Sequence, residues 1–189
     1  MKHLYYTGVG SRGTPKTQCE VLKALGSRLA HAHYTLRSGG AEGADTAFED
    51  GAKEFLIRSP KQFYDIYLPW DGFEGRRKGM NYHSPEDVPP QLWARAIEIA
   101  KDIHPHWASC SKGARTLHTR NVFQVLGHSL DDPSKFLICW APVDRKGVPE
   151  GGTATAWRIA KEHNVRCFNI NTTFDLFELN DFLLDLKVA

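Results

Sequence analysis

The chain has 189 residues, of which 41% are apolar and 24% are charged, a balance typical of globular rather than disordered proteins. Its longest apolar runs fall well short of the roughly 20 residues that a membrane-spanning helix needs, so we expect no membrane partner. A formal net charge of +2 is too small to predict nucleic-acid binding from the overall field. A chain of this length can bury one core without metals or disulfides, so we expect residues 1–189 to form a single domain.

The N-terminus and the cysteines indicate in which cellular compartment the protein resides. The first residues lead directly into a predicted strand and lack the apolar segment and cleavage site of a secretory signal. The four cysteines form no C-x-x-C pair, which favours reduced thiols over disulfides or a zinc site: Cys19, Cys110, Cys139 and Cys167. We therefore expect a cytoplasmic protein with no cofactor.

Strand-like and helix-like patterns alternate along the chain, which predicts a parallel sheet covered by helices. Strands are predicted at residues 4–9, 34–37, 63–68, 136–140 and 165–170. Helices are predicted at residues 15–31, 44–52, 91–104, 114–126, 156–163 and 174–186, the first with Thr14 as its N-cap, and a long loop at residues 69–90. Residues 136–140 are almost entirely apolar, as in a strand buried on both faces. We expect an α/β fold, a Rossmann-like open and mostly parallel sheet with helices on both faces.

Three glycine-rich turns follow predicted strands and precede predicted helices. They cover residues 8–12 (GVGSR), 38–45 (SGGAEGAD) and 149–155 (PEGGTAT). Glycine lets backbone N–H groups approach an anion closely, and the helix that follows adds unpaired N–H groups and the positive end of its dipole. In a parallel sheet such turns share the edge where ligands bind. The sequence therefore predicts one nucleotide-sized site with amides that hold phosphate.

The three turns also resemble those of the SLOG superfamily, the Rossmann-like group that contains DNA-processing protein A (DprA) and the cytokinin-activating LOG enzymes. The DprA branch is the more similar, through G-S-R after the first strand, S-G-G-x-x-G-x-D before the second helix, and the late glycine-threonine turn. Residues 119–127 (TRNVFQVLG) are similar to a segment of small stand-alone, often phage-encoded, DprA-like proteins. The resemblance covers most of the chain.

The resemblance implies a set of ligand-binding residues on the three turns and on the helix at residues 114–126. Arg12 has the planar guanidinium that pairs bidentately with phosphate. Trp70, which follows a predicted strand end, is a candidate for stacking on a base. The full set is Gly8, Gly10, Ser11, Arg12, Ser38, Gly39, Gly40, Gly43, Asp45, Trp70, Arg120, Asn121, Gly151, Gly152 and Thr153.

Three functions fit these residues. The first is binding of a nucleotide or nucleotide-derived molecule, by a sensor or a sequestering protein. The second is hydrolysis of an N-glycosidic or phosphodiester bond, with Glu42 and Asp45 as candidate carboxylates. The LOG-type motif P-G-G-x-G-T-x-x-E has no counterpart of its glutamate here, and Asp45 also suits a helix cap, so the enzyme class stays open. The third is single-stranded DNA binding in the DprA manner, aided by Lys112, Arg115 and Arg120.

The remaining candidates have simpler interpretations. The close histidine pairs, 31/33 and 104/106, lie at predicted helix ends, where a cation suits the helix dipole, so we expect no metal. The basic run 76–78 is typical of a solvated surface. The resemblance implies a homo-oligomer, since family members often pair through a helix or a sheet edge.

Overall fold

The computed structural model describes residues 4–54 and 62–188. Its centre is a six-stranded sheet with the order β4-β3-β2-β1-β5-β6, in which every neighbouring pair of strands is parallel. The strands are β1 (Leu4–Gly10), β2 (Tyr34–Ser38), β3 (Tyr64–Tyr67), β4 (Tyr82–His83), β5 (Phe136–Trp140) and β6 (Arg166–Asn169). The predicted α/β fold with an open parallel sheet is confirmed.

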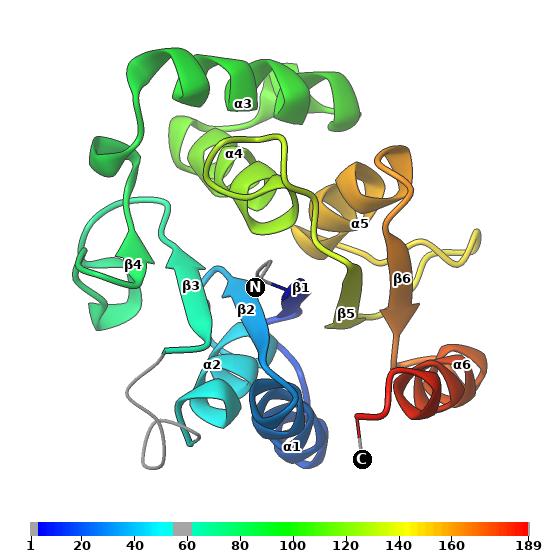
Figure 1. Cartoon of the computed structure of the whole chain (residues 1–189). Helices are drawn as coiled ribbons and strands as arrows, with labels where there is room; N and C mark the ends of the chain where they lie inside the picture. Colours follow the sequence, from blue (N-terminus) through cyan, green and yellow to red (C-terminus); the bar gives the residue numbers. More distant parts are fainter. Residues whose placement is uncertain (1–3, 55–61, 189) are drawn as a thin grey trace.

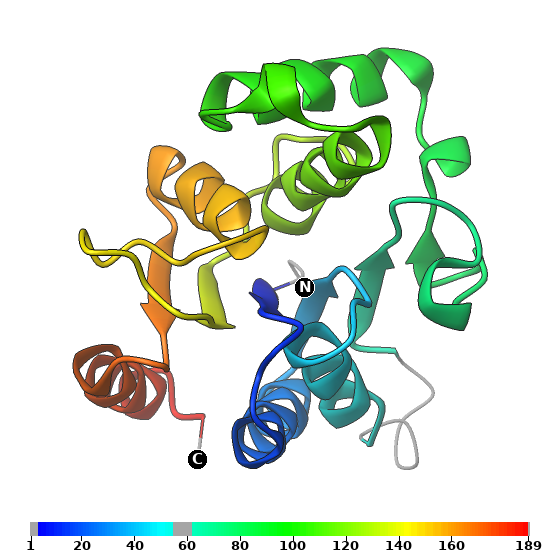
Figure 2. The ribbon, with the colours of Figure 1, turned by 180° about the vertical axis from the view of Figure 1, so that it is seen from behind.

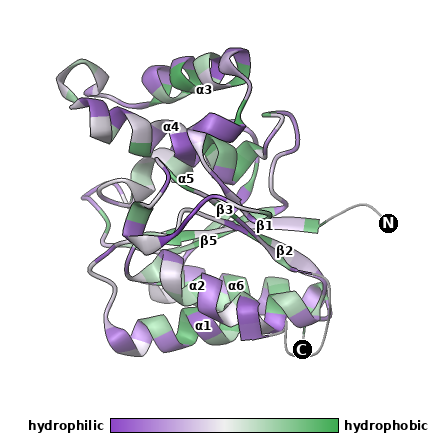
Figure 3. Ribbon diagram, turned by 90° about the vertical axis from the view of Figure 1, so that its left-hand side faces the viewer, coloured by the Kyte–Doolittle hydropathy of each residue, from purple (hydrophilic) through white to green (hydrophobic). Residues whose placement is uncertain are grey.

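Helices cover both faces of the sheet, as predicted (Figures 1 and 2). Figure 3 shows the two helical layers edge-on, with α1 (Lys16–His31), α2 (Ala44–Glu54) and α6 (Thr173–Asp185) on one face. The opposite face carries α3 (Pro90–Ile103), α4 (Lys112–Leu126) and α5 (Thr153–Glu162). Three short 3-10 helices lie in the connections: η2 (Phe73–Gly75), η3 (Pro85–Asp87) and η4 (Trp107–Ser109). No helix in the described ranges has both the length and the apolar character needed to cross a bilayer.

The core has two halves, one on each face of the sheet. Side chains alternate between the faces of a strand, so Phe136 and Ile138 of β5 join the cluster under α1, α2 and α6. Leu137 and Cys139 of the same strand join the cluster under α4 and α5. All four are fully buried, which explains why this strand is apolar throughout.

The order of the strands creates a topological switch point between β1 and β5, where the direction in which the chain adds strands to the sheet reverses. From β1 the chain moves through α1 and α2 toward β3 on one side of the sheet. It then returns over the opposite face through α3 and α4 to place β5 next to β1. The connections that leave the carboxyl ends of β1 and β5 therefore diverge, and such a divergence is where open parallel sheets bind ligands.

The structure corrects three details of the sequence prediction. Residues 69–90 are not simply a loop, because they contain β4 and two 3-10 helices. Thr14 is not the N-cap of α1: Pro15 takes that position, and the Thr14 hydroxyl donates to the Ser11 carbonyl at 2.6 Å. Helix α5 begins at Thr153, inside the third glycine turn, rather than at residue 156. Residues 1–3, on which the expectation about a secretory signal depends, lie outside the described residues.

Candidate anion-binding site

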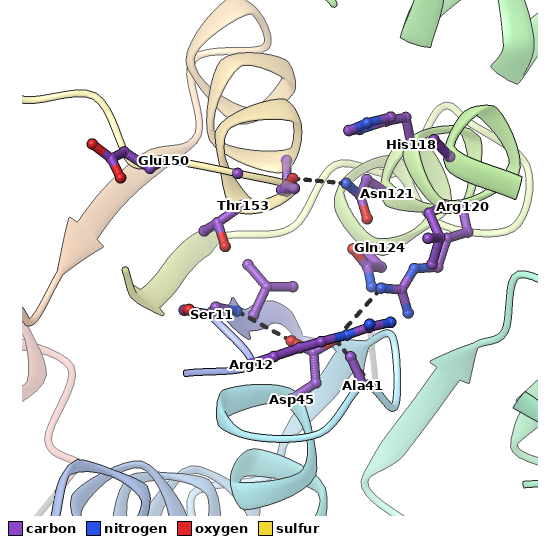
Figure 4. A pocket seen from close by; sticks show the side chains of 17 residues that line it. Ser11, Arg12, Ala41, Asp45, His118, Arg120, Asn121, Gln124, Glu150 and Thr153 are labelled. Atoms are coloured by element: carbon purple, nitrogen blue, oxygen red, sulfur yellow. Dashed lines mark hydrogen bonds and ion pairs between the residues drawn. The ribbon is translucent and has the colours of Figure 1, made fainter. Parts of the chain in front are cut away.

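A cavity of about 290 Å³ lies beyond the carboxyl ends of β1 and β5, at the switch point (Figure 4). All three glycine turns contribute to its wall, and α4 closes it from above the sheet. The lining residues are Val9, Gly10, Ser11, Arg12, Ala41, Asp45, Ala114, Leu117, His118, Arg120, Asn121, Gln124, Glu150, Gly151, Gly152, Thr153 and Ala156. The structure thus brings the predicted turns together with the predicted Arg120 and Asn121.

Asp45 fastens the first two turns to each other. It is 3% exposed, and its carboxylate accepts the N–H of Gly10 at 3.1 Å and that of Ala41 at 3.4 Å. Burial raises its pKa, while the charge of Arg120 and these backbone donors act in the opposite direction. Asp45 therefore serves as an acceptor that holds the backbone of two loops, with both oxygens engaged.

Several backbone amides of the first two turns already bond within the protein. The N–H of Ser11 donates to the Trp140 carbonyl at 2.9 Å, and that of Ala44 donates to the Ser11 carbonyl at 3.3 Å. Gly43, with φ of +83°, lets the turns pack backbone against backbone, because a Cβ there would lie 2.5 Å from the Ser11 oxygen. The amides of Ser11 and Ala44 therefore hold the first two turns against each other and against β5.

The amides at the start of α5 are different, because they have no acceptor. The N–H groups of Gly151, Gly152 and Thr153 donate to no acceptor within the described part of the chain, and no side chain caps this helix. A Cβ on Gly151 or Gly152 would meet open space. Gly151, Gly152 and Thr153 line the cavity, so three N–H groups without an acceptor and the positive end of a helix dipole lie at its wall.

Asn121 connects α4 to this helix end. Its side-chain amide donates to the Gly152 carbonyl at 3.0 Å, which leaves the N–H of Gly152 free to face a ligand. Figure 4 shows this hydrogen bond across the upper part of the cavity, between α4 and the third turn. Asn121 thus fixes the position of the open amides.

Arg120 supplies a buried positive charge to the opposite wall. It is 7% exposed, donates from Nη1 to the carbonyl of Gly39, and lies 3.8 Å from Asp45 through Nη2. Its Nε has no partner. A buried guanidinium with one close acceptor and a loose ion pair has donor capacity left for an anionic ligand.

Gln124 lies one turn further along α4 and is the least satisfied polar side chain of the cavity. It is 1% exposed, and neither its amide nitrogen nor its amide oxygen has a hydrogen-bond partner. An unpaired buried donor or acceptor costs about 1–3 kcal/mol. Gln124 therefore keeps one donor and one acceptor unpaired beside the cavity.

Arg12 lies at the mouth of the cavity. Its side chain is 57% exposed and reaches Glu74 at 3.9 Å, and its guanidinium lies over the Phe73 ring at 5.8 Å. Arg120 lies over the same ring at 5.5 Å. The phenyl ring thus positions two cations at one side of the cavity.

Several predicted residues lie outside the cavity lining. Gly8 is packed in the core, where a Cβ would lie 2.7 Å from Leu36 and 2.8 Å from Phe48. Gly39 leaves room for Arg120 and Gln124, and Gly40, at φ of +65°, leaves room for Arg76. The remaining four, which also do not line it, are Ser38, Gly43, Trp70 and Glu42.

The sequence analysis missed Gln124 and His118 as site residues. A helical face is a signal that could have found them, because positions 118 and 124 each lie three residues from the predicted Asn121. His118 is bonded through Nδ1 to the Thr155 hydroxyl at 2.9 Å. Burial, with smaller effects of His104 and Arg120, lowers the pKa of His118 to about 4, so it is neutral at physiological pH.

The basic run 76–78 and Arg115, one of the residues considered for DNA binding, have partners within the protein. Arg76 pairs with the buried Glu49 at 2.8 Å, Arg77 with Asp71 at 3.1 Å and Lys78 with Glu86 at 2.6 Å. Arg115 donates to the backbone carbonyls of Trp107 and Ala108. Arg115 is thus engaged with the protein backbone, whereas the ion pairs of Arg77 and Lys78 lie on the exposed surface, where such pairs are weak.

No known family model matches this chain, and no curated protein matches it. Among solved structures, the chain is similar to DNA processing protein A from Helicobacter pylori, which was described for its single-stranded DNA binding mode. The two are 12% identical with a TM-score of 0.45, over 98% of this chain and 74% of that chain. The strand order and the crossovers described above carry the assignment of the fold.

Proposed function

We propose that this protein binds a mononucleotide, or a phosphorylated molecule of that size, in the cavity between β1 and β5, and that it senses or sequesters this ligand. The proposal rests on one observation: two walls of the cavity both carry polar groups that have no hydrogen-bond partner in the protein. One wall presents the uncapped amides of α5, and the other presents buried polar atoms of Arg120 and Gln124 without partners. Buried polar groups of native proteins are normally paired, so such a concentration indicates a missing ligand.

The proposal assigns a part of the ligand to each wall. Phosphate suits the amides of Gly151, Gly152 and Thr153, where the dipole of α5 favours negative charge, and Arg12 at the mouth adds a second contact. Gln124 presents both a donor and an acceptor, which suits the edge of a base or a sugar hydroxyl. A cavity of about 290 Å³ lies at the small end of ligand pockets, which favours a mononucleotide over a dinucleotide.

The two carboxylates that the sequence analysis considered do not form a pair at the cavity, although Glu150 also lines it. Both oxygens of Asp45 accept backbone hydrogen bonds, and Glu42 lies outside the cavity lining. The carboxylate pair considered in the sequence is therefore not assembled around the cavity. We expect a nucleotide incubated with the protein to be recovered unchanged by chromatography.

Isothermal titration with AMP, GMP, CMP, UMP and inorganic phosphate tests the proposal. Gly152→Asp places a carboxylate at the open helix end, and we expect it to weaken binding at least about tenfold by repelling the phosphate. Gly152→Ala, a control for size, and Gly79→Asp, a control for charge at another open glycine, should bind like the wild type. Wild-type protein that binds none of these compounds, or a Gly152→Asp variant with unchanged affinity, would contradict the proposal.

A further inference from the structure

Two histidines and a cysteine from separate segments converge beside the cavity. His104 is the C-cap of α3, Cys110 follows η4 directly before the N-cap of α4, and His118 lies within α4. One ligand atom from each of the three lies within 4.8 Å of the other two. All three side chains are half-buried, so an ion can reach them from solvent.

The local hydrogen bonds indicate which ring nitrogen of each histidine can bind a metal. The backbone N–H of His106 donates to Nδ1 of His104 at 3.2 Å, which makes Nδ1 the unprotonated nitrogen of the neutral ring. This nitrogen lies 3.8 Å from the Cys110 sulfur. In His118, Nδ1 is engaged with the Thr155 hydroxyl, which leaves Nε2 for a metal. A second-shell hydrogen bond of this kind is usual for metal-bound histidine.

We propose that His104, Cys110 and His118 bind one zinc ion. Zinc prefers nitrogen and thiolate ligands, at about 2.0 and 2.3 Å, so tetrahedral ligand atoms lie about 3.3–3.6 Å apart. The cluster needs to contract by about 1 Å to reach this spacing. The Cys110 thiol loses its proton when the metal binds. At Nδ1 of His104, zinc replaces the hydrogen bond from the His106 N–H. The three protein ligands leave the fourth coordination position to water.

Two arginines lie near the cluster and oppose a cation there, so the site depends on the negative charge of the Cys110 thiolate. Arg158 lies near His104, and Arg120 lies near His118. The thiolate offsets one charge of the ion, and the second remains as a net positive charge next to the anion site. His118 also lines the cavity, so the two sites are neighbours, but zinc binding requires no nucleotide and is measured without one.

Cobalt(II) substitution tests the proposal, because cobalt in a tetrahedral site with a thiolate ligand gives a sulfur-to-metal charge-transfer band. Metal-free protein, prepared with a chelator, should take up one cobalt per chain with this band, and zinc should displace it. We expect Cys110→Ser to lose the band and His104→Asn to lose the bound metal. Cys19→Ser, at the other half-buried cysteine, and His106→Asn are the matched controls and should behave like the wild type.

A measurement on the unaltered chain covers the case in which a variant fails to fold. Alkylation of Cys110 by iodoacetamide, followed by peptide mass spectrometry, should slow strongly when zinc is added, while alkylation of Cys19 should not change. Absence of zinc binding by the wild type, retention of the band in Cys110→Ser, or equal alkylation of Cys110 with and without zinc would each overturn the proposal.

Discussion

Arg120 and Gln124 lie one turn apart on α4, and both approach Gly39 so closely that a Cβ there would displace the ends of their side chains. Arg120 uses this closeness to donate to the Gly39 carbonyl, but Gln124 gains no hydrogen bond from it. The fold therefore buries a polar side chain at a cost in stability. Such a cost is common at functional sites, where a ligand completes the pairing.

We predict opposite effects of Gln124→Met on stability and on binding. Methionine fills a similar volume without leaving a donor and an acceptor unpaired, so the ligand-free protein should become more stable by about 1–2 kcal/mol. The same change removes two ligand contacts, and affinity for the best mononucleotide should fall. Urea unfolding and titration calorimetry measure the two quantities. A variant that is both less stable and equally tight in binding would refute this role of Gln124.

Asp45→Asn should destabilise the protein by about 2–4 kcal/mol in urea unfolding. Asparagine must turn an NH₂ group toward the N–H of Gly10 or Ala41, and Arg120 loses its counter-charge. Asp50→Asn, at an exposed position of the same helix, is the control and should lie within about 0.5 kcal/mol of the wild type. An equally small effect at Asp45 would show that this carboxylate does not hold the two turns together.

The contact between α1 and α2 depends on glycine. A Cβ on Gly51 would collide with the carbonyl of Lys23 and lie 2.9 Å from the Ser27 nitrogen, and one on Gly26 would lie 2.7 Å from the Phe48 oxygen. Gly51→Ala should therefore cost about 1–3 kcal/mol, although alanine is the better helix former. Gly113→Ala, in the open on α4, should instead be neutral or stabilising by up to about 1 kcal/mol. Thermal denaturation of the two variants decides whether the crossing is as tight as described.

Arg12→Ala should weaken mononucleotide binding and leave stability nearly unchanged. The side chain is 57% exposed and its ion pair with Glu74 spans 3.9 Å, so its loss should alter the free energy of unfolding by less than about 0.5 kcal/mol. Loss of a phosphate contact should reduce affinity roughly tenfold. Arg77→Ala, at a side chain 79% exposed, is the control. Equal affinity of both variants would remove Arg12 from the site.

The sequence predicted the layers of the fold because alternation of strand and helix patterns is a local signal. It also predicted that the three turns meet, since the carboxyl ends of parallel strands share one edge of a sheet. It did not predict β4, because two residues are too short to show a period. The sequence therefore predicts long, periodic elements better than an element of two residues.

The sequence could not show which amides are free. Asp45 in the first turn of a helix has the pattern of a local cap, whereas one of its acceptor bonds goes to Gly10, 35 residues earlier. Gln124 looks like an ordinary helix-surface residue until the approach of Gly39 shows that it is buried. Occupied amides and unpaired side chains depend on long-range packing, which no local pattern records.

Amide NMR of the labelled protein during a mononucleotide titration tests the central claim most directly. We predict the largest shifts at the N–H groups of Gly151, Gly152 and Thr153 and at the side-chain amide of Gln124, and smaller shifts at Gly10 and Ala41, whose N–H groups already bond to Asp45. Shifts that are absent, or that fall elsewhere while residues 151–153 stay unchanged, would contradict an anion site at the start of α5.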